Sequence, residues 1–254
     1  MKSTERFTDR VDDYVKYRPH YPQAVFDTLR EKIGDPNGSA IADIGSGTGI
    51  STKPLVEMGF EVFAVEPNAA MREAAERELT RFRRFHSVAA TAENTLLADG
   101  SVDAVLAAQA FHWFDRPVVH KEFGRILKPG GWVALVWNDR DASRTSLARD
   151  YEQLLLTFGS DYGQVKSSGQ GANQRGWLNG FFGRQRYEEI TFKNHQLLDF
   201  DAFRGRLLSA SYMPKPADCG HSRMLDEIER IFARHQSAEH VRIDYETKLF
   251  LGHL

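Results

Sequence analysis

The sequence has very little of several features that would narrow its function. It contains one cysteine, Cys219, which excludes an intramolecular disulfide framework and a zinc site built from cysteines. No apolar run approaches the length that crosses a membrane, and the opening residues MKSTERFTDR lack an apolar signal segment. We therefore expect a cytoplasmic protein with no membrane partner.

The chain also lacks an excess of charge of either sign. It has 33 Lys and Arg against 35 Asp and Glu, and its pI is about 6.5. Domains that hold nucleic acid are usually strongly basic, and the basic run RFRR at 81–84 is short. We expect no nucleic-acid partner. No group of His, Cys, Asp and Glu has the spacing of metal ligands, so we also expect no metal.

What the chain does have is a regular alternation of strand-like and helix-like segments in its first half. A length of 254 residues with 41% hydrophobic residues can form one large core with at most a modest insertion. Alternating strands and helices predict a parallel sheet with right-handed crossovers, an α/β doubly wound fold. The expected strands are 40–44, 60–66, 85–90, 102–108 and 132–138.

After Asn138 the alternation gives way to a different arrangement. Residues 145–158 should be helical, and residues 159–183 hold seven of the 20 glycines. We expect this glycine-rich stretch to be irregular, as a lid, a binding loop or a disordered segment. A strand near 186–192, helices near 199–210 and 217–236, and a last strand over 244–254 should follow.

Three glycines follow the first expected strand directly, in the stretch IADIGSGTGIST at 41–52. Glycine at the carboxyl end of a parallel strand lets a ligand approach the main chain closely. The dinucleotide pattern G-x-G-x-x-G is absent, because Ile50 occupies its third glycine position. A phosphate-binding P-loop is excluded because no Lys-Ser/Thr pair follows. The pattern present is D-x-G-x-G-x-G, which starts at Asp43.

A carboxylate stands where a ribose anchor is expected. Glu66 ends the second strand, 21 residues after Gly45. A carboxylate at this offset can accept hydrogen bonds from both hydroxyls of an adenosine ribose. A solvated residue at a strand end is the plain alternative, but the glycine loop at this distance favours the binding role.

Four segments together resemble a known family. ADIGSGTG (42–49), VFAVEPN (62–68), ATAENTLLADGSVDAVLAAQAFHWFD (90–115) and RILKPGGWVALVWN (125–138) are similar, in order, to the motifs of class I S-adenosyl-L-methionine (SAM)-dependent methyltransferases. The best match is the methyltransferase type 11 group, which includes trans-aconitate methyltransferase-like proteins. The resemblance covers about residues 7–140 well.

The resemblance implies a Rossmann-like architecture. We expect a doubly wound seven-stranded sheet, mostly parallel with an antiparallel C-terminal strand, and helices on both faces. The chain should be one domain with three parts: cofactor-covering helices (1–34), a SAM-binding core (35–140), and substrate-side helices, the glycine-rich loop and the last strands (141–254).

The resemblance also assigns residues to the cofactor. SAM should be bound, with S-adenosyl-L-homocysteine as the product, by Asp43, Gly45, Ser46, Gly47, Glu66, Pro67, Ala92, Glu93 and Gln109. The segment YVKYRPHYP at 14–22 is similar to an entrance segment in which Tyr14 and Arg18 cover the cofactor. An amphipathic helix that ends before Pro19 and buries its aromatics in the core is an equally good interpretation.

Methyl transfer from a sulfonium is an in-line displacement that mainly needs proximity and alignment. A general base matters only for a poor nucleophile, and a carboxylate acceptor would need an arginine clamp instead. His112 is the first candidate for a base, although a local supporting role explains it as well. Candidate substrate residues are Tyr17, His112, Trp137 and Tyr212.

We therefore expect a methyltransferase that is a monomer or a homodimer. Its acceptor would be a small molecule with an oxygen, nitrogen or carbon nucleophile, a carboxylate included. The alternative from another class is a regulatory module that binds SAM or a nucleotide without catalysis. A dinucleotide-dependent dehydrogenase is disfavoured by the missing third glycine.

Overall fold

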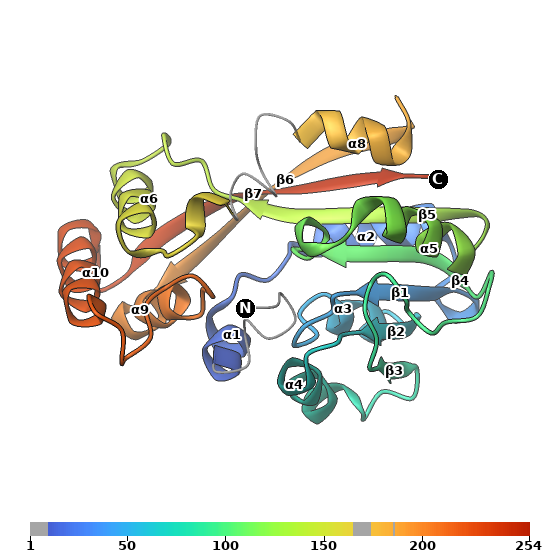
Figure 1. Ribbon diagram of the computed structural model, residues 1–254, viewed down its shortest axis with the longest axis horizontal. Coiled ribbons are helices and arrows are strands. Elements are labelled where there is room, and N and C mark those ends of the chain that lie inside the picture. Colours follow the sequence, from blue (N-terminus) through green and yellow to red (C-terminus); the bar gives the residue numbers. More distant parts are fainter. Residues whose placement is uncertain (1–9, 165–173, 185) are drawn as a thin grey trace.

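A seven-stranded sheet runs through the molecule (Figure 1). The computed structural model describes residues 10–164, 174–184 and 186–254. The strand order is β3-β2-β1-β4-β5-β7-β6; β7 pairs antiparallel with both β5 and β6, and the other pairs of neighbouring strands are parallel. This confirms the predicted α/β doubly wound fold with an antiparallel C-terminal strand. The strands are β1 Ala40–Ile44, β2 Glu61–Val65, β3 Phe85–Val88, β4 Val102–Ala108, β5 Leu127–Asp139, β6 Tyr187–Leu198 and β7 Val241–Gly252.

Helices cover both faces of this sheet (Figure 1). The central strands read as continuous apolar runs because both of their faces are buried, as is usual for parallel sheets. One face packs against α5 (Arg116–Ile126) and α8 (Gln174–Phe182). The other face packs against α2 (Gln23–Ile33), α3 (Thr52–Glu57) and α4 (Ala69–Leu79). Short 3₁₀ turns lie at Pro36–Gly38 and Phe111–Trp113.

Side-chain caps fix where two of these helices begin. The Oδ1 atom of Asn68 accepts a hydrogen bond from the Met71 amide at 3.1 Å, and Asp115 accepts one from Val118 at 3.4 Å. Asn and Asp are among the residues most favoured at helix N-caps. The start of β5 differs from its expected position, because the strand begins at Leu127 and includes the KPGG segment. Leu127 pairs with Val102 before a register shift, so the strand is irregular there.

A second, smaller core lies beyond the main sheet. Residues 241–245 of β7 extend past β5 and pair only with β6 (Figure 1). Helices α6 (Ser146–Phe158), α9 (Phe200–Leu208) and α10 (His221–His235) pack around this extension with their apolar faces. The helices predicted near 145–158, 199–210 and 217–236 are therefore confirmed.

Helix α1 (Val11–Tyr17) lies between the two cores and contacts both α9 and α4 (Figure 1). The Tyr17 ring packs so closely on α9 that a Cβ at Gly205 would lie 2.1 Å from it. Just before α1, the Arg10 guanidinium donates hydrogen bonds of 2.5–2.6 Å to the carbonyls of Leu208, Ala210 and Met213. The N-terminal helix is thus tied to the end of α9.

Part of the glycine-rich stretch is regular, contrary to the sequence-based expectation. Residues 174–182 form α8, and residues 165–173 lie outside the described part of the chain. Leu178, Phe181 and Phe182 are buried against α5 and the sheet. The expectation of an irregular stretch rested on its glycine content. Burial of these apolar side chains stabilises the helix by more than the low helix propensity of Gly176 and Gly180 costs.

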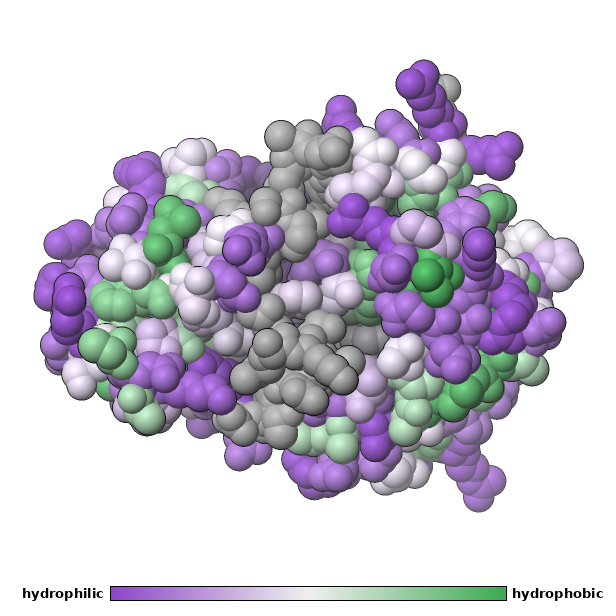
Figure 2. Space-filling model, in the orientation of Figure 1, coloured by the Kyte–Doolittle hydropathy of each residue, from purple (hydrophilic) through white to green (hydrophobic). Residues whose placement is uncertain are grey.

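The exposed surface is mixed in character. On the face seen in Figure 2, hydrophilic residues dominate and hydrophobic ones appear in small separate groups. Among the described residues, no helix combines the length and the apolar character needed to cross a bilayer. Cys219 is exposed. The cytoplasmic location, the three-part division and the oligomeric state stay predictions.

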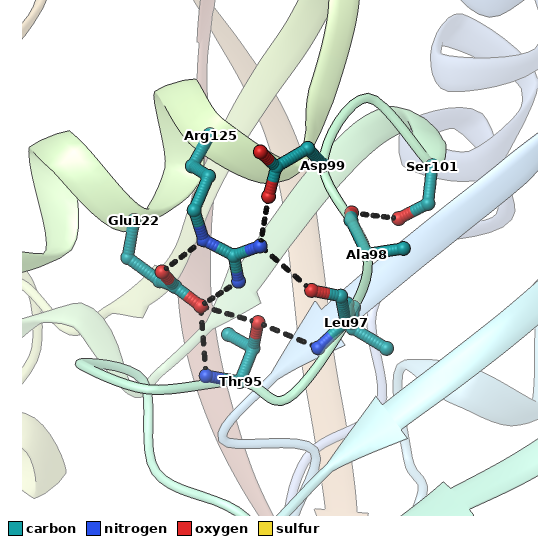
Figure 3. Close-up of polar contacts among 7 residues, drawn as sticks. All are labelled: Thr95, Leu97, Ala98, Asp99, Ser101, Glu122 and Arg125. Atoms are coloured by element: carbon teal, nitrogen blue, oxygen red, sulfur yellow. Dashed lines mark hydrogen bonds and ion pairs between the residues drawn. The ribbon is translucent and has the colours of Figure 1, made fainter.

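A polar network supports the loop that leads from β3 to β4 (Figure 3). The carboxylate of Glu122 on α5 accepts hydrogen bonds from the Thr95 amide at 2.8 Å and the Thr95 hydroxyl at 2.6 Å. The Arg125 guanidinium donates to the same carboxylate and also to the Leu97 carbonyl and Asp99. Because Glu122 is only 9% exposed, loss of these hydrogen bonds would leave a buried charge without partners and would destabilise the fold.

The network predicts an acid-sensitive contribution to stability. Hydrogen bonds from Arg125, and then from Thr95, hold the pKa of Glu122 at about 2, below its ordinary 4.5. A depressed carboxyl pKa stabilises the fold above the ordinary value, and this stabilisation is lost as pH falls towards the folded value. We expect Glu122→Gln to lower the free energy of unfolding by about 1–3 kcal/mol at neutral pH.

The measurement is urea unfolding from about pH 7 to about pH 3. The difference between wild type and Glu122→Gln should shrink as the pH falls. The exposed Glu73→Gln variant on α4 is the matched control and should change little. A deficit in Glu122→Gln that is the same at every pH would contradict the role assigned to the charge.

Candidate functional site

The glycine loop joins β1 to α3 at the carboxyl edge of the sheet. Gly45, Gly47 and Gly49 have φ angles of 70°, 56° and 84°, in the region that side chains rarely adopt. The Gly45 amide donates to the Val65 carbonyl at 2.8 Å, so the loop is held to β2. A Cβ at Gly45 would lie 2.6 Å from the Cβ of Ala110. Glycine is therefore required there for the loop to contact the segment after β4.

Glu66 joins this loop to the start of the next helix. One carboxylate oxygen accepts a hydrogen bond from the Gly47 amide at 3.0 Å, and the other accepts one from the Asn68 amide at 2.8 Å. Burial raises the pKa of Glu66, and the two backbone donors partly oppose that rise. A carboxylate has about four acceptor positions, so Glu66 can accept further bonds from a ligand.

The first of two cavities at this edge opens beside Glu66. It is framed by the glycine loop, the start of α4, the segment after β3 and the segment after β4. Its lining residues are Tyr14, Gly45, Gly47, Glu66, Pro67, Asn68, Met71, Thr91, Ala92, Glu93, Ala108, Gln109, Ala110, Trp113 and Phe114.

Asp43 is completely buried near this cavity but does not line it. Its Oδ2 atom accepts hydrogen bonds from the hydroxyls of Ser51 at 2.8 Å and Thr52 at 2.6 Å. Its Oδ1 atom is buried and has no hydrogen-bond partner within the described ranges. Burial raises the pKa of Asp43 to about 6, while the two hydroxyls oppose the shift. A buried acceptor without a donor is costly unless a ligand or water satisfies it.

The second cavity adjoins the first and lies between the two cores. Both cavities are lined by Tyr14, Gln109 and Trp113. The other lining residues come from the N-terminal segment, the glycine loop, the turn after β4, the end of β5, and α6 and α9 with the segments that follow them. They are Arg18, Pro19, Tyr21, Ile50, His112, Trp137, Asn138, Arg140, Glu152, Tyr162, Arg206, Ser211 and Tyr212.

Gln109 is held in an unusual backbone conformation at the shared wall. Its φ angle is 55°, which is uncommon for a residue other than glycine. Its amide donates to the Val136 carbonyl at 2.8 Å, and its Nε2 atom lies 3.3 Å from the Asn138 carbonyl. Backbone strain of this kind clusters at functional sites because the surrounding structure must enforce it.

His112 lies in the second cavity with its ring beside Trp113, at 4.8 Å between centroids. Burial, and then the positive charge of Arg116, lowers the pKa of His112 to about 4. Its Nδ1 atom is buried without a partner among the described residues. The imidazole is thus neutral at physiological pH and is a weak base.

The residues predicted for the cofactor fall into three groups in the structure. Tyr14, Gly45, Gly47, Glu66, Pro67, Ala92, Glu93 and Gln109 line the first cavity. Asp43 and Ser46 are buried next to it, outside its lining. Arg18 lines the second cavity instead, with Tyr14 and Gln109 shared between the two.

The predicted substrate residues are also separated. His112, Trp137 and Tyr212 line the second cavity, whereas Tyr17 packs against Gly205 on α9 and lines neither cavity. Sequence reasoning missed Arg140 and Arg206 of the second cavity. Each stands outside any motif, and only the folded arrangement of β5 and α9 brings them together.

No candidate metal centre is found in the part of the chain that the structure describes. There, no group of three or more His, Cys, Asp and Glu side chains could hold a metal ion. The polar groups at the two cavities are instead backbone amides, carboxylates, phenols and guanidinium groups. They are suited to hydrogen-bonding an organic ligand.

The close approach at Gly45 predicts a local stability defect. Gly45→Ala should lower the free energy of unfolding by about 2 kcal/mol or more, because it adds both a positive-φ penalty and a clash with Ala110. The matched control is Gly124→Ala in α5, where a Cβ meets nothing within 4 Å. That variant should gain up to about 1 kcal/mol. Denaturant unfolding measures both, and equal stability of the two variants would refute the packing argument.

Known proteins resemble this chain in the part that forms the glycine loop and most of the first cavity. Residues 42–135 match a family described as "methyltransferase domain". An uncharacterized methyltransferase of Mycobacterium tuberculosis is 38% identical over 149 residues, which is 59% of this chain and 58% of that protein. The match thus spans less than two thirds of that relative's length.

Two further proteins match over nearly the whole chain. An uncharacterized methyltransferase-like protein of Schizosaccharomyces pombe is 28% identical, over 96% of this chain and 93% of its own. The structure of a candidate type II methyltransferase from Anaeromyxobacter dehalogenans has a TM-score of 0.65 at 24% identity, covering 93% of this chain and 97% of that one. It shares the fold. The stretch matched by the methyltransferase domain contains the end of β1, the glycine loop, Glu66 and Gln109.

Proposed function

We propose that the protein transfers the methyl group of SAM to a small-molecule acceptor. The observation that carries this proposal is the pair of adjoining cavities that share Tyr14, Gln109 and Trp113. The first is built on the glycine loop and Glu66, and the second is a neighbouring space with lining residues of its own, which could receive a separate molecule. The match of residues 42–135 to a methyltransferase domain supports the assignment.

The residues of the first cavity fit SAM chemically. Glu66 keeps acceptor capacity for the ribose hydroxyls after its two backbone bonds. Ala92 and Glu93 would flank the adenine. The unpartnered Oδ1 atom of Asp43 supplies negative charge near the glycine loop, where the ammonium group of the methionine moiety would be held. When bound, SAM supplies a methyl group on a positively charged sulfur that leaves readily.

The contribution of the protein would be mainly positioning. The shared wall would hold the acceptor in line with the methyl group, and such alignment can contribute about 7–11 kcal/mol. Gln109 would fix this wall through its bonds to the strand-end carbonyls of Val136 and Asn138. His112 is a weak base, so the site favours a nucleophile that is already deprotonated, whether oxygen, nitrogen or carbon.

Calorimetric titration with SAM, S-adenosyl-L-homocysteine and NAD tests the cofactor class. Both sulfur nucleotides should bind and NAD should not. Glu66→Gln should weaken SAM binding by about tenfold to a hundredfold, the loss of one charge-assisted hydrogen bond. Glu73→Gln should leave it unchanged. Methylation of a metabolite library then tests turnover, and binding without turnover of any acceptor would favour a regulatory module.

Asp43 gives a second prediction that joins stability to binding. Burial raises its pKa from 3.8 to about 6, so its ionisation opposes folding. Its stabilising contribution is complete below the ordinary value and is lost as pH rises through about 6. Asp43→Asn avoids this loss, which for the wild type amounts to about 3 kcal/mol by neutral pH.

We therefore expect Asp43→Asn to be at least as stable as wild type at about pH 8 in urea unfolding, yet to bind SAM more weakly. Wild-type affinity for SAM should increase from about pH 5 to about pH 7.5 as the carboxylate ionises. If Asp43→Asn binds SAM as tightly as wild type does, the role of Asp43 is limited to its hydrogen bonds with Ser51 and Thr52.

A further inference from the structure

Three arginine side chains line the second cavity from different parts of the chain. Arg18 follows α1, Arg140 follows β5, and Arg206 lies on α9. Arg206 is only 6% exposed. The N-terminal segment, the main sheet and the smaller core therefore each contribute one guanidinium group to the same space.

The three charges lie close enough to act on one another. Burial, and then the charge of Arg206, lowers the pKa of Arg18. Burial raises the pKa of the nearby Tyr151 phenol, but the charges of Arg206, Arg140 and Arg18 together hold it below its ordinary value. The three guanidinium groups thus act on the same phenol, as their common place in the lining of the second cavity requires.

These guanidinium groups are incompletely satisfied. The Nε atoms of Arg18 and Arg206 and the Nη1 atom of Arg140 are buried without a hydrogen-bond partner in the described part of the chain. Within the same ranges, none of the three forms an ion pair with a carboxylate. Arg18 does donate one hydrogen bond, from Nη2 to the Ser209 carbonyl at 3.0 Å. Buried donors and charges of this kind are costly unless a partner meets them.

Aromatic rings compensate part of this cost. Arg18 lies over the Tyr14 ring at 4.7 Å, and Arg140 lies over the Tyr151 ring at 4.3 Å. Such contacts stabilise a cation. They would be a sufficient account if the arginines served only to pack against the rings. They leave the net charge unchanged, however, and among the described residues the Nε atoms of Arg18 and Arg206 and the Nη1 atom of Arg140 still have no partner. The aromatic contacts therefore explain the position of the arginines without explaining their number.

The rest of the lining does not balance the charge. Glu152 is the one carboxylate among the described lining residues, and it accepts a hydrogen bond from the Tyr162 hydroxyl at 2.7 Å. His112 is neutral at physiological pH because burial lowers its pKa to about 4. Three guanidinium groups against one carboxylate give the described lining a net charge of two positive units.

We propose that the second cavity binds an acceptor that carries two negative charges, held by Arg18, Arg140 and Arg206. The planar fork of arginine matches carboxylate and phosphate oxygens, so a dicarboxylate and a phosphate ester share the required chemistry. The methyl-transfer role of this ligand rests on the proposed function, whereas its binding depends only on the cavity. Neutral and cationic molecules of similar size should be rejected.

The test uses the full chain, titrated by calorimetry and by thermal unfolding at constant ionic strength. The probes are succinate, glutarate and glycerol phosphate, with neutral succinamide and cationic putrescine as counterparts. Each is added with and without S-adenosyl-L-homocysteine. The dianions should bind and raise the unfolding temperature, because a ligand of the native state stabilises it. Preference among the dianions separates carboxylate from phosphate recognition.

Two variants of the same helix sharpen the test. Arg206→Gln should weaken dianion binding by about tenfold to a hundredfold. Arg204→Gln removes an exposed charge from α9 and should leave binding unchanged, which controls for long-range electrostatics. Arg140→Lys keeps the charge and loses the fork, so it should reduce affinity even if Arg206→Gln does not fold.

The outcomes separate this inference from the proposed function. Binding of S-adenosyl-L-homocysteine with equal affinity for dianions and succinamide would overturn the anion site and leave the methyltransferase proposal standing. Dianion binding without any binding of the sulfur nucleotide would support the anion site and refute the methyltransferase proposal. Equal loss of dianion affinity in Arg204→Gln and Arg206→Gln would also overturn the inference.

Discussion

The geometry of the site depends on the carboxylate of Glu66. It accepts one backbone hydrogen bond from the loop after β1 and another from the start of α4, so it fixes two neighbouring loops at one edge of the sheet. Parallel strands bring their carboxyl ends to the same edge, and a strand-end acid can reach both loops there. The opening of the first cavity, and the position of the wall it shares with the second, follow from this link.

The second constraint is the length of β6 and β7. Because these strands continue beyond β5, helices α6 and α9 can pack outside the main sheet while facing its carboxyl edge. The second cavity is the space that remains between the two cores. Its charge follows from the same arrangement, since each flanking part contributes an arginine that it cannot neutralise on its own.

Local signals in the sequence predicted the sheet and the glycine loop, because each depends on residues close together in the chain. The helical state of 174–182 was missed because burial against α5 decides it. Arg140 and Arg206 were missed for a related reason. Each looks like an ordinary surface arginine in its own segment, and only long-range packing gives the two a common environment.

Helix α1 contacts both α9 and α4, is tied down by Arg10, and contributes Tyr14 to both cavities. A ligand in either cavity that contacts Tyr14 would change the surface that a ligand in the other cavity meets. Thermodynamic linkage then requires that each ligand changes the affinity of the other by the same factor. Tyr14 is therefore a route by which binding in one cavity can alter binding in the other without any change in the sheet.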